Sequence, residues 1–196
     1  MKTKIGNANG VIFVYTKDYI IKTHGENTWL DLLNNLSAED KLHLSKNLIK
    51  TAWYSAPLLN RLINTYDAIH GNGDFAKIIP IVEHIAKNDL NPVFQVFLDL
   101  KNPAFVLNNA PTLWKRYFDS GEMIIDIANE ENKRYILHLE EIADENLASG
   151  MAICTIGIST WIKTGLEMTE AKNIRAVHTE CRYKDDKSCT IEVTWD

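Results

Sequence analysis

The stretch HTECRYKDDKSCTIEVTWD, at positions 178–196, decides the fold of this chain. Two alternating runs flank the polar segment YKDDK, and this pattern is typical of a β-hairpin. If that segment forms the turn, Cys181 lies opposite Cys189 across the two strands. His178 and Glu180 then lie on the polar face, since a register shifted by one residue would bury them. The sequence therefore predicts a closing hairpin with both cysteines on its inward, apolar face.

Upstream of this hairpin the sequence predicts a second hairpin and a long helix. The segment GEMIIDIANEENKRYILHLEE, at 121–141, contains two alternating runs around NEEN. Residues 147–170 are expected to form a long helix that contains Cys154 and Trp161. The order of elements over 121–196 is then β-β-α-β-β, which indicates an antiparallel sheet with one helix.

Residues 1–120 are expected to form a mainly helical subdomain. Ser37 followed by Asp40 has the spacing of a capping box at the start of a helix. The run GVIFVY at 10–15 is the exception, and we expect a short strand after Gly10. Pro80 is expected to bend a later helix, because an interior proline removes one helix hydrogen bond.

Length and composition are those of one globular domain, 1–196, of the α+β class. The chain has 196 residues, of which 45% are hydrophobic and 24% charged, with a net charge of −5. Acidic and basic residues are mixed, so the sequence predicts neither a nucleic-acid surface nor a membrane surface. The apolar runs are too short to span a bilayer, and MKTKIGNANG is not followed by the apolar core of a secretory signal. With an odd number of cysteines as well, we expect a reduced cytoplasmic protein.

The closing hairpin and the helix before it carry a family resemblance. CTIGISTWIKTGLEMTEAKNIRAVHTECRYKDDKSCTIEVTW is similar to the vinyl-reductase type of sensory domain, a relative of H-NOX haem/nitric-oxide domains and TRAPP vesicle-tethering subunits. The resemblance is strongest over 150–196, and WY at 53–54 and RYFDSGE at 116–122 match uncharacterised bacterial proteins. It implies an H-NOX/TRAPP-like fold in a bacterial protein, with a small-molecule pocket between the helical half and the sheet.

The same resemblance bears on haem. H-NOX domains bind haem through a histidine on a helix ahead of the sheet and hold its propionates with a Y-x-S-x-R motif. This chain has Tyr135, but Leu137 and Leu139 stand where that motif has serine and arginine. His84 is the histidine on a suitable helix. A haem-based gas sensor is therefore a lesser alternative, and no haem is expected.

The resemblance also marks Cys154, Cys181 and Cys189 as possible metal ligands. Zinc is the alternative cofactor here, but a structural zinc site takes four ligands, and His178 lies on the other face in the expected register. The favoured interpretation is that the three thiols are reduced, metal-free and packed as small hydrophobes. A disulfide between Cys181 and Cys189 is expected less, because the compartment is expected to be reducing.

Enzyme signatures are missing from the sequence. It contains no P-loop, G-x-S-x-G, H-E-x-x-H or dinucleotide motif. Carboxylate pairs such as Glu140 and Glu141 are typical of solvated turns. We therefore expect a protein that is not an enzyme.

Two functions fit these observations. In the first, the chain is a cytoplasmic sensor or regulatory domain that binds a small hydrophobic ligand and signals to a partner protein. Aromatic side chains are expected to line its pocket: Phe94, Phe97, Phe105, Trp114, Tyr117 and Trp161. In the second, it is a structural or interaction protein with a filled core. A homodimer is expected in both cases, because twofold dimers are the commonest assembly.

Overall fold

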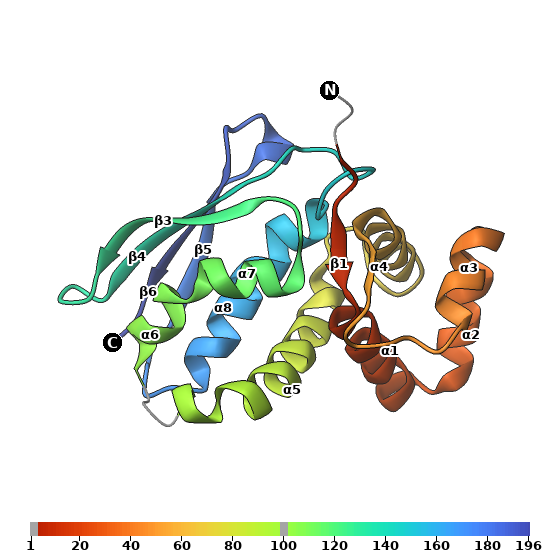
Figure 1. The fold of residues 1–196 in the computed structure, drawn as a ribbon, viewed down its shortest axis with the longest axis horizontal. Coiled ribbons are helices and arrows are strands. Elements are labelled where there is room, and N and C mark those ends of the chain that lie inside the picture. Colours follow the sequence, from red (N-terminus) through yellow and green to blue (C-terminus); the bar gives the residue numbers. More distant parts are fainter. Residues whose placement is uncertain (1–3, 99–101) are drawn as a thin grey trace.

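Helices form the first half of the chain and an antiparallel sheet dominates the second half (Figure 1). The computed structural model describes residues 4–98 and 102–196, with side chains outside 91–101. The helices are α1 (Gly10–His24), α2 (Glu26–Asn34), α3 (Ala38–Ser45), α4 (Ala56–His70), α5 (Ile79–Leu98), α6 (Pro103–Asn108), α7 (Ala110–Tyr117) and α8 (Ile158–Glu167). The strands are β1 (Asn7–Asn9), β2 (Trp53–Ser55), β3 (Glu122–Asn129), β4 (Arg134–Glu140), β5 (Arg175–Glu180) and β6 (Cys189–Thr194). The α+β class predicted from the sequence is confirmed.

The first helix, α1, replaces the strand that the sequence predicts after Gly10. Its start is fixed by Asn9, whose side-chain oxygen accepts a hydrogen bond from the backbone N–H of Val11 at 3.0 Å. The helix packs against both α2 and α5, so Val11, Ile12 and Phe13 are all buried. A helix that is covered on several sides carries a continuous apolar run, which resembles the run of a buried strand. The prediction of a strand was wrong for this reason.

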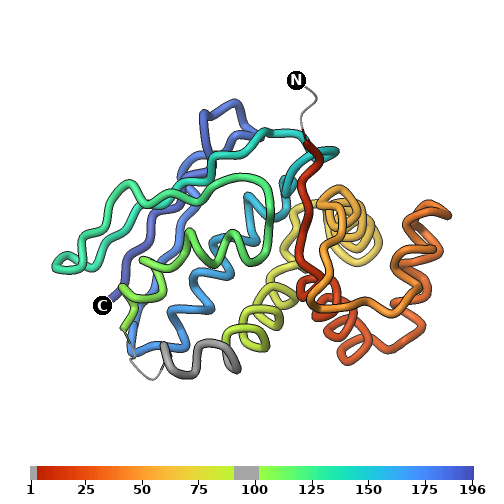
Figure 2. The backbone as a smooth tube through the Cα atoms, in the orientation of Figure 1, coloured from red at the N-terminus to blue at the C-terminus, as the bar shows by residue number. Residues whose placement is uncertain are grey.

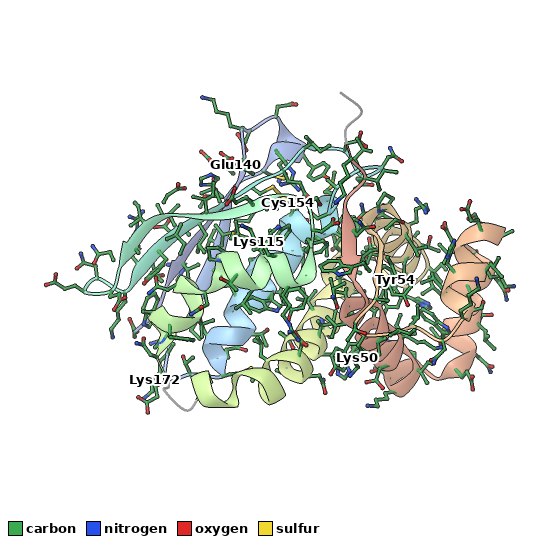
Figure 3. All side chains as sticks on the ribbon, viewed as in Figure 1. Lys50, Tyr54, Lys115, Glu140, Cys154 and Lys172 are labelled. Atoms are coloured by element: carbon green, nitrogen blue, oxygen red, sulfur yellow. A yellow bond between two sulfur atoms is a disulfide. The ribbon has the colours of Figure 1, made fainter. Side chains whose placement is uncertain are left out.

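The helical half confirms one local prediction and corrects another. Ser37 caps α3 as expected, because its hydroxyl oxygen accepts from the backbone N–H of Asp40 at 3.1 Å. Pro80 does not bend a helix, since it lies in the first turn of α5, where a missing N–H removes no helix hydrogen bond. Lys50 and Tyr54, both labelled in Figure 3, belong to the connection that leads from α3 through β2.

The main sheet has the strand order β3-β4-β6-β5, and all its pairs are antiparallel. Figure 2 shows β6, the last strand along the chain, inside the sheet, with the helical segments on one side of it. The covered face carries buried side chains from the two central strands: Tyr135, Leu137, Leu139, Ile191 and Val193. Both predicted hairpins are therefore present, and β6 joins them into one sheet.

The closing hairpin contains a bulge that the sequence pattern does not reveal. Glu180 pairs with Thr190, as the predicted register requires, but His178 pairs with Ile191 because the register shifts between His178 and Glu180. Beyond the bulge each side chain of β5 faces the side opposite to the predicted one. The predicted register pairs Val177 with Val193 on the inward face, but Val177 pairs with Glu192 and is 45% exposed, so that prediction was wrong.

The long helix predicted at 147–170 is shorter and starts irregularly. A five-residue π turn, Ile153–Gly157, precedes α8. The loop before it contains Gly150, which has a φ of +84°, and a Cβ there would collide with the side chain of Asn60. Within residues 4–98 and 102–196, no helix is long and apolar enough to cross a membrane.

Candidate functional site

An apolar cavity lies where the helical half meets the sheet and its long helix. Its volume is about 80 Å³. The wall is made by side chains of α1, α5, α7, β3, the π turn and α8. The lining residues are Ile12, Val82, Ile85, Ala110, Leu113, Trp114, Tyr117, Phe118, Met123, Ile153, Gly157, Ile158, Trp161 and Ile162. The cavity therefore has the position that the family resemblance implies for a pocket.

Three of the six predicted aromatic residues lie on this wall, namely Trp114, Tyr117 and Trp161. Phe105 is half-buried on α6 and is not part of the lining. Phe94 and Phe97 belong to α5, but their side chains lie outside the described residues. Whether any of these residues binds a ligand stays a prediction.

A buried polar group holds the aromatic wall in place. Asp89, which is 4% exposed, accepts a hydrogen bond from the Tyr117 hydroxyl at 2.6 Å. Arg116 donates two further hydrogen bonds to the same carboxylate, at 2.8 and 3.0 Å. The indole N–H of Trp161 donates to the Tyr117 oxygen at 3.4 Å. Burial, followed by the neighbouring Asp89, raises the pKa of Tyr117, so the phenol stays protonated and donates.

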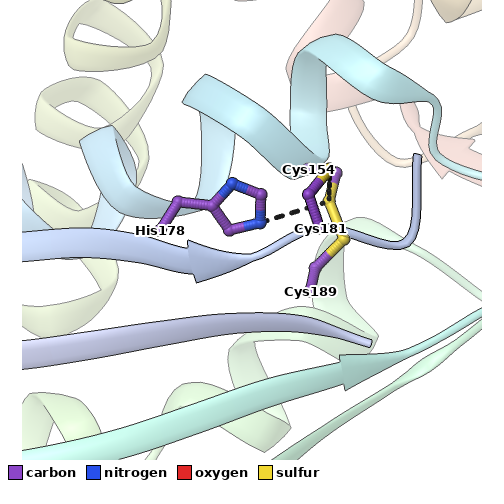
Figure 4. Close-up of side chains that lie close together, drawn as sticks. All are labelled: Cys154, His178, Cys181 and Cys189. Carbon is purple, nitrogen blue, oxygen red and sulfur yellow. Dashed lines mark hydrogen bonds between the residues drawn. A yellow bond between two sulfur atoms is a disulfide. The ribbon is translucent and has the colours of Figure 1, made fainter. Parts of the chain in front are cut away.

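The three cysteines and one histidine form a second cluster beneath the sheet (Figure 4). Cys154 comes from the π turn, His178 from β5, Cys181 from the residue after β5, and Cys189 from the start of β6. Their sulfur and ring nitrogen atoms all lie within 4.8 Å of one another. The three cysteines are buried, and Figure 3 places Cys154 near the start of the helix below the sheet.

The bonding within the cluster differs from the prediction. A disulfide joins Cys154 to Cys189, whereas the sequence predicts reduced thiols. Cys181 is a buried free thiol, and its sulfur lies 3.9 Å from that of Cys154. The inward, buried positions predicted for Cys181 and Cys189 are confirmed.

His178 joins the cluster because of the bulge in β5. The predicted register puts it on the opposite face, but its Nε2 lies 3.6 Å from the sulfur of Cys154. Burial lowers the pKa of His178, and the charges of Lys184 and Arg182 lower it further, while Asp186 opposes them. The ring is therefore neutral near pH 7, which is the form that binds metal ions.

A buried ion pair lies next to this cluster. The Nη2 group of Arg182 donates to Glu141 at 2.8 Å, and their side chains are 3% and 2% exposed. The other oxygen of Glu141 accepts from the Ser120 hydroxyl at 2.8 Å and from the backbone N–H of Ser149 at 3.2 Å. The interpretation of Glu141 as a solvated turn residue was therefore wrong.

Comparison with known proteins identifies the fold. No protein-family model and no curated protein matches the chain. A solved structure of an H-NOX protein from S. oneidensis in the Fe(II)NO state matches with a TM-score of 0.66 and 13% identity, over 96% of this chain and 99% of that one. The chain has the H-NOX fold.

Two further H-NOX structures agree with this assignment. The H-NOX domain from Shewanella oneidensis in the Fe(II)CO state matches with a TM-score of 0.68 and 12% identity, over 96% of this chain and 98% of that one. The Fe(II) unliganded H-NOX protein from K. algicida matches with a TM-score of 0.64 and 11% identity, over 96% of both chains. At these identities the similarity concerns the fold alone.

The described residues of this H-NOX fold do not fit a haem. The cavity of about 80 Å³ is far smaller than the roughly 300–1,000 Å³ of typical cofactor pockets. No histidine or cysteine is among its lining residues. His84 lies elsewhere, because its Nε2 is 2.8 Å from a carboxylate oxygen of Asp18, and its ring packs against Tyr15 and Tyr19.

Sequence reasoning missed three residues of these sites. His178 was placed on the wrong face, and neither Asp89 nor the buried position of Glu141 was anticipated. The RYFDSGE motif gave an indirect signal, because it contains Arg116, Tyr117 and Ser120, which bind these two carboxylates.

Proposed function

We propose that this chain is a ligand-binding sensor module that holds a small apolar molecule between its helical half and its sheet. The observation that carries the proposal is the apolar cavity, whose wall combines α1 and α5 with β3, the π turn and α8. A molecule in this cavity contacts both halves of the fold. Ligand binding therefore stabilises the arrangement of the two halves that fits the ligand better. Such a shift in the population of arrangements is how a sensor responds to its ligand.

The cavity limits the class of ligand. Its volume of about 80 Å³ is roughly half of the 150 Å³ that holds benzene or xenon in an engineered apolar cavity. The Tyr117 hydroxyl already donates to Asp89 and accepts from Trp161, so these rings present mainly carbon to the cavity. The ligand class is therefore an apolar molecule of a few heavy atoms.

Xenon is a suitable probe of this cavity. We expect xenon pressure to shift the indole N–H resonances of Trp114 and Trp161 in a saturable manner, because both rings line the cavity. Trp29, Trp53 and Trp195 are not among the lining residues, so their resonances should shift little. Two-dimensional NMR of the oxidised protein measures all of these signals at once.

Filling the cavity provides the matched control. Ala110→Leu adds three carbon atoms to the wall and should remove most of the xenon response. Ala128→Leu makes the same change at an exposed position of β3 and should leave the response intact. The alternative of a protein with a filled core would be favoured if xenon shifted all five indole signals equally, or if Ala110→Leu changed nothing.

A second candidate function is metal binding by the Cys/His cluster in its reduced form. Zinc in a tetrahedral site, with bonds of about 2.0–2.3 Å, places neighbouring ligand atoms roughly 3.3–3.8 Å apart. The distances of 3.6 Å from Cys154 to His178 and 3.9 Å from Cys154 to Cys181 are close to this range. With Cys189 the set is Cys₃His, a common structural zinc site, once the disulfide is opened. This geometry supports zinc over the metal-free thiols that the sequence favours.

The zinc proposal predicts a stoichiometry and a histidine effect. Protein purified with a dithiol reductant and zinc should contain about one zinc per chain, as measured by elemental analysis after gel filtration. His178→Ala should lower the zinc affinity at least tenfold, because it removes one of four ligands. His138→Ala is the control, since this histidine of β4 contacts Asp126 on β3 instead of the cluster. Equal zinc affinity in both variants would contradict the proposal.

The finer assignment to the vinyl-reductase type of sensory domain is also a proposal, supported by the closing hairpin. We further propose that the module is non-catalytic and cytoplasmic, and that it forms a homodimer which signals to a partner protein. The commonness of twofold assembly supports the homodimer.

A further inference from the structure

The apolar cavity and the Cys/His cluster share one structural element, the π turn Ile153–Gly157. Ile153 and Gly157 belong to the cavity wall. Cys154, which follows Ile153, forms the disulfide with Cys189 on β6 (Figure 4). A movement of Cys154 therefore moves backbone that lines the cavity.

Both flanks of this turn are held in place. The segment N-terminal to the turn is held by Asn60 of α4. The side-chain amide of Asn60 donates hydrogen bonds to the carbonyl oxygens of Glu145 and Ala148, at 2.9 and 2.8 Å. Gly150 fits closely against the same Asn60 side chain. On the side after it, α8 packs against α5 and β5. A displacement of Cys154 is consequently taken up within the turn.

The π turn is suited to absorb such a displacement. π-helical turns are rare insertions in α-helices and occur frequently at functional sites. Close-packed interiors respond to a local shift by moving between discrete arrangements. The disulfide ties Cys154, within this turn, to Cys189 at the start of β6. Opening this bond removes a constraint that pre-organises this part of the cavity wall, and a less pre-organised site binds a ligand more weakly.

We propose that the covalent state of Cys154 regulates ligand binding in the apolar cavity, with the disulfide form binding more tightly than the reduced form. This inference rests on the proposed sensor function. A dithiol reductant converts the disulfide to two thiols and is itself oxidised to a cyclic disulfide. In the reverse direction, hydrogen peroxide oxidises the two thiols to the disulfide, and two molecules of water are formed.

The test compares the xenon affinity of the two forms of the native protein. The indole shifts of Trp114 and Trp161 are followed against xenon pressure, with and without dithiothreitol, and with a chelator present to exclude metal. We expect the disulfide form to bind xenon about fivefold more tightly or better, in the usual range of coupling between two sites. By linkage, xenon should then raise the disulfide fraction in a glutathione buffer relative to argon.

Two variants assign the effect to the correct bond. Cys181→Ser keeps the Cys154–Cys189 disulfide and should retain the full difference between the oxidised and reduced forms. The double variant Cys154→Ser/Cys189→Ser should bind xenon as the reduced protein does, with or without dithiothreitol. The comparison of the two native forms stands by itself if the double variant does not fold.

The outcomes separate this inference from the function on which it rests. Equal or reversed xenon affinities in the two native forms would overturn the regulation and leave the cavity site intact. Absence of xenon binding in both forms would overturn the sensor proposal and the regulation together.

Discussion

Replacing Glu141 by alanine lowers the free energy of unfolding by about 3–5 kcal/mol, the usual cost of removing one partner from a buried ion pair. The side chains of Glu141 and Arg182 are 2% and 3% exposed, so the guanidinium cannot regain its hydration in the folded variant. Its Nε and Nη1 groups already lack hydrogen-bond partners, and the loss of Glu141 removes its buried counter-charge. Urea unfolding of the oxidised protein, followed by circular dichroism, measures this loss.

Two comparisons test the assignment of this cost to buried charge. Glu167→Ala removes an exposed partner of Lys163 on α8 and should cost less than about 0.5 kcal/mol. Replacing the buried pair together, by Glu141→Leu and Arg182→Met, should recover most of the stability. A loss below about 1 kcal/mol for Glu141→Ala would show that water or another group compensates Arg182.

Reducing the disulfide between Cys154 and Cys189 lowers the free energy of unfolding by about 3–4 kcal/mol in metal-free buffer. The two cysteines are separated by 35 positions. A disulfide that closes a loop of this length lowers the entropy of the unfolded chain, and this loss corresponds to about 3–4 kcal/mol of stability. Urea unfolding with and without dithiothreitol, in the presence of a chelator, gives the difference directly.

The third cysteine supplies the control for this measurement. Cys181→Ser should lose as much stability on reduction as the native protein, because Cys181 is outside the disulfide. Zinc added to the reduced native protein should restore stability, since a metal that binds only the folded state stabilises it. Zinc should restore less stability in reduced Cys181→Ser, because this variant lacks one of the proposed zinc ligands. A change below 1 kcal/mol on reduction of the native protein would contradict the expectation.

Most of the sheet could be predicted from the sequence because its strands alternate cleanly. The hairpin at 121–141 and the closing hairpin each bury one face, and alternation reports such one-sided burial directly. The segment at 10–15 could not be assigned in this way. It lies in a helix covered from several directions, and a short apolar run has the same appearance in a buried strand and a buried helix.

The sites were predictable only in part, for physical reasons. The inward position of Cys181 and Cys189 follows from alternation, but a bulge leaves no mark in the residue pattern, and it alone brings His178 to the thiols. The buried carboxylates were unpredictable for another reason. Glu141 pairs with Arg182 across 41 positions, and charged residues are rarely buried unless they are paired. A local window of sequence contains no information about such a partner.

The central place of β6 has a consequence for the order in which the molecule is assembled. This strand comes after all the other described strands along the chain, yet it lies between β4 and β5. While the ribosome is still adding residues 189–194, β4 has an unpaired edge, and Cys154 has no Cys189 to meet. The helical half, which depends on shorter-range contacts, can fold first. The complete sheet and the disulfide form only after residues 189–194 have been made, so β4 keeps an exposed edge until then.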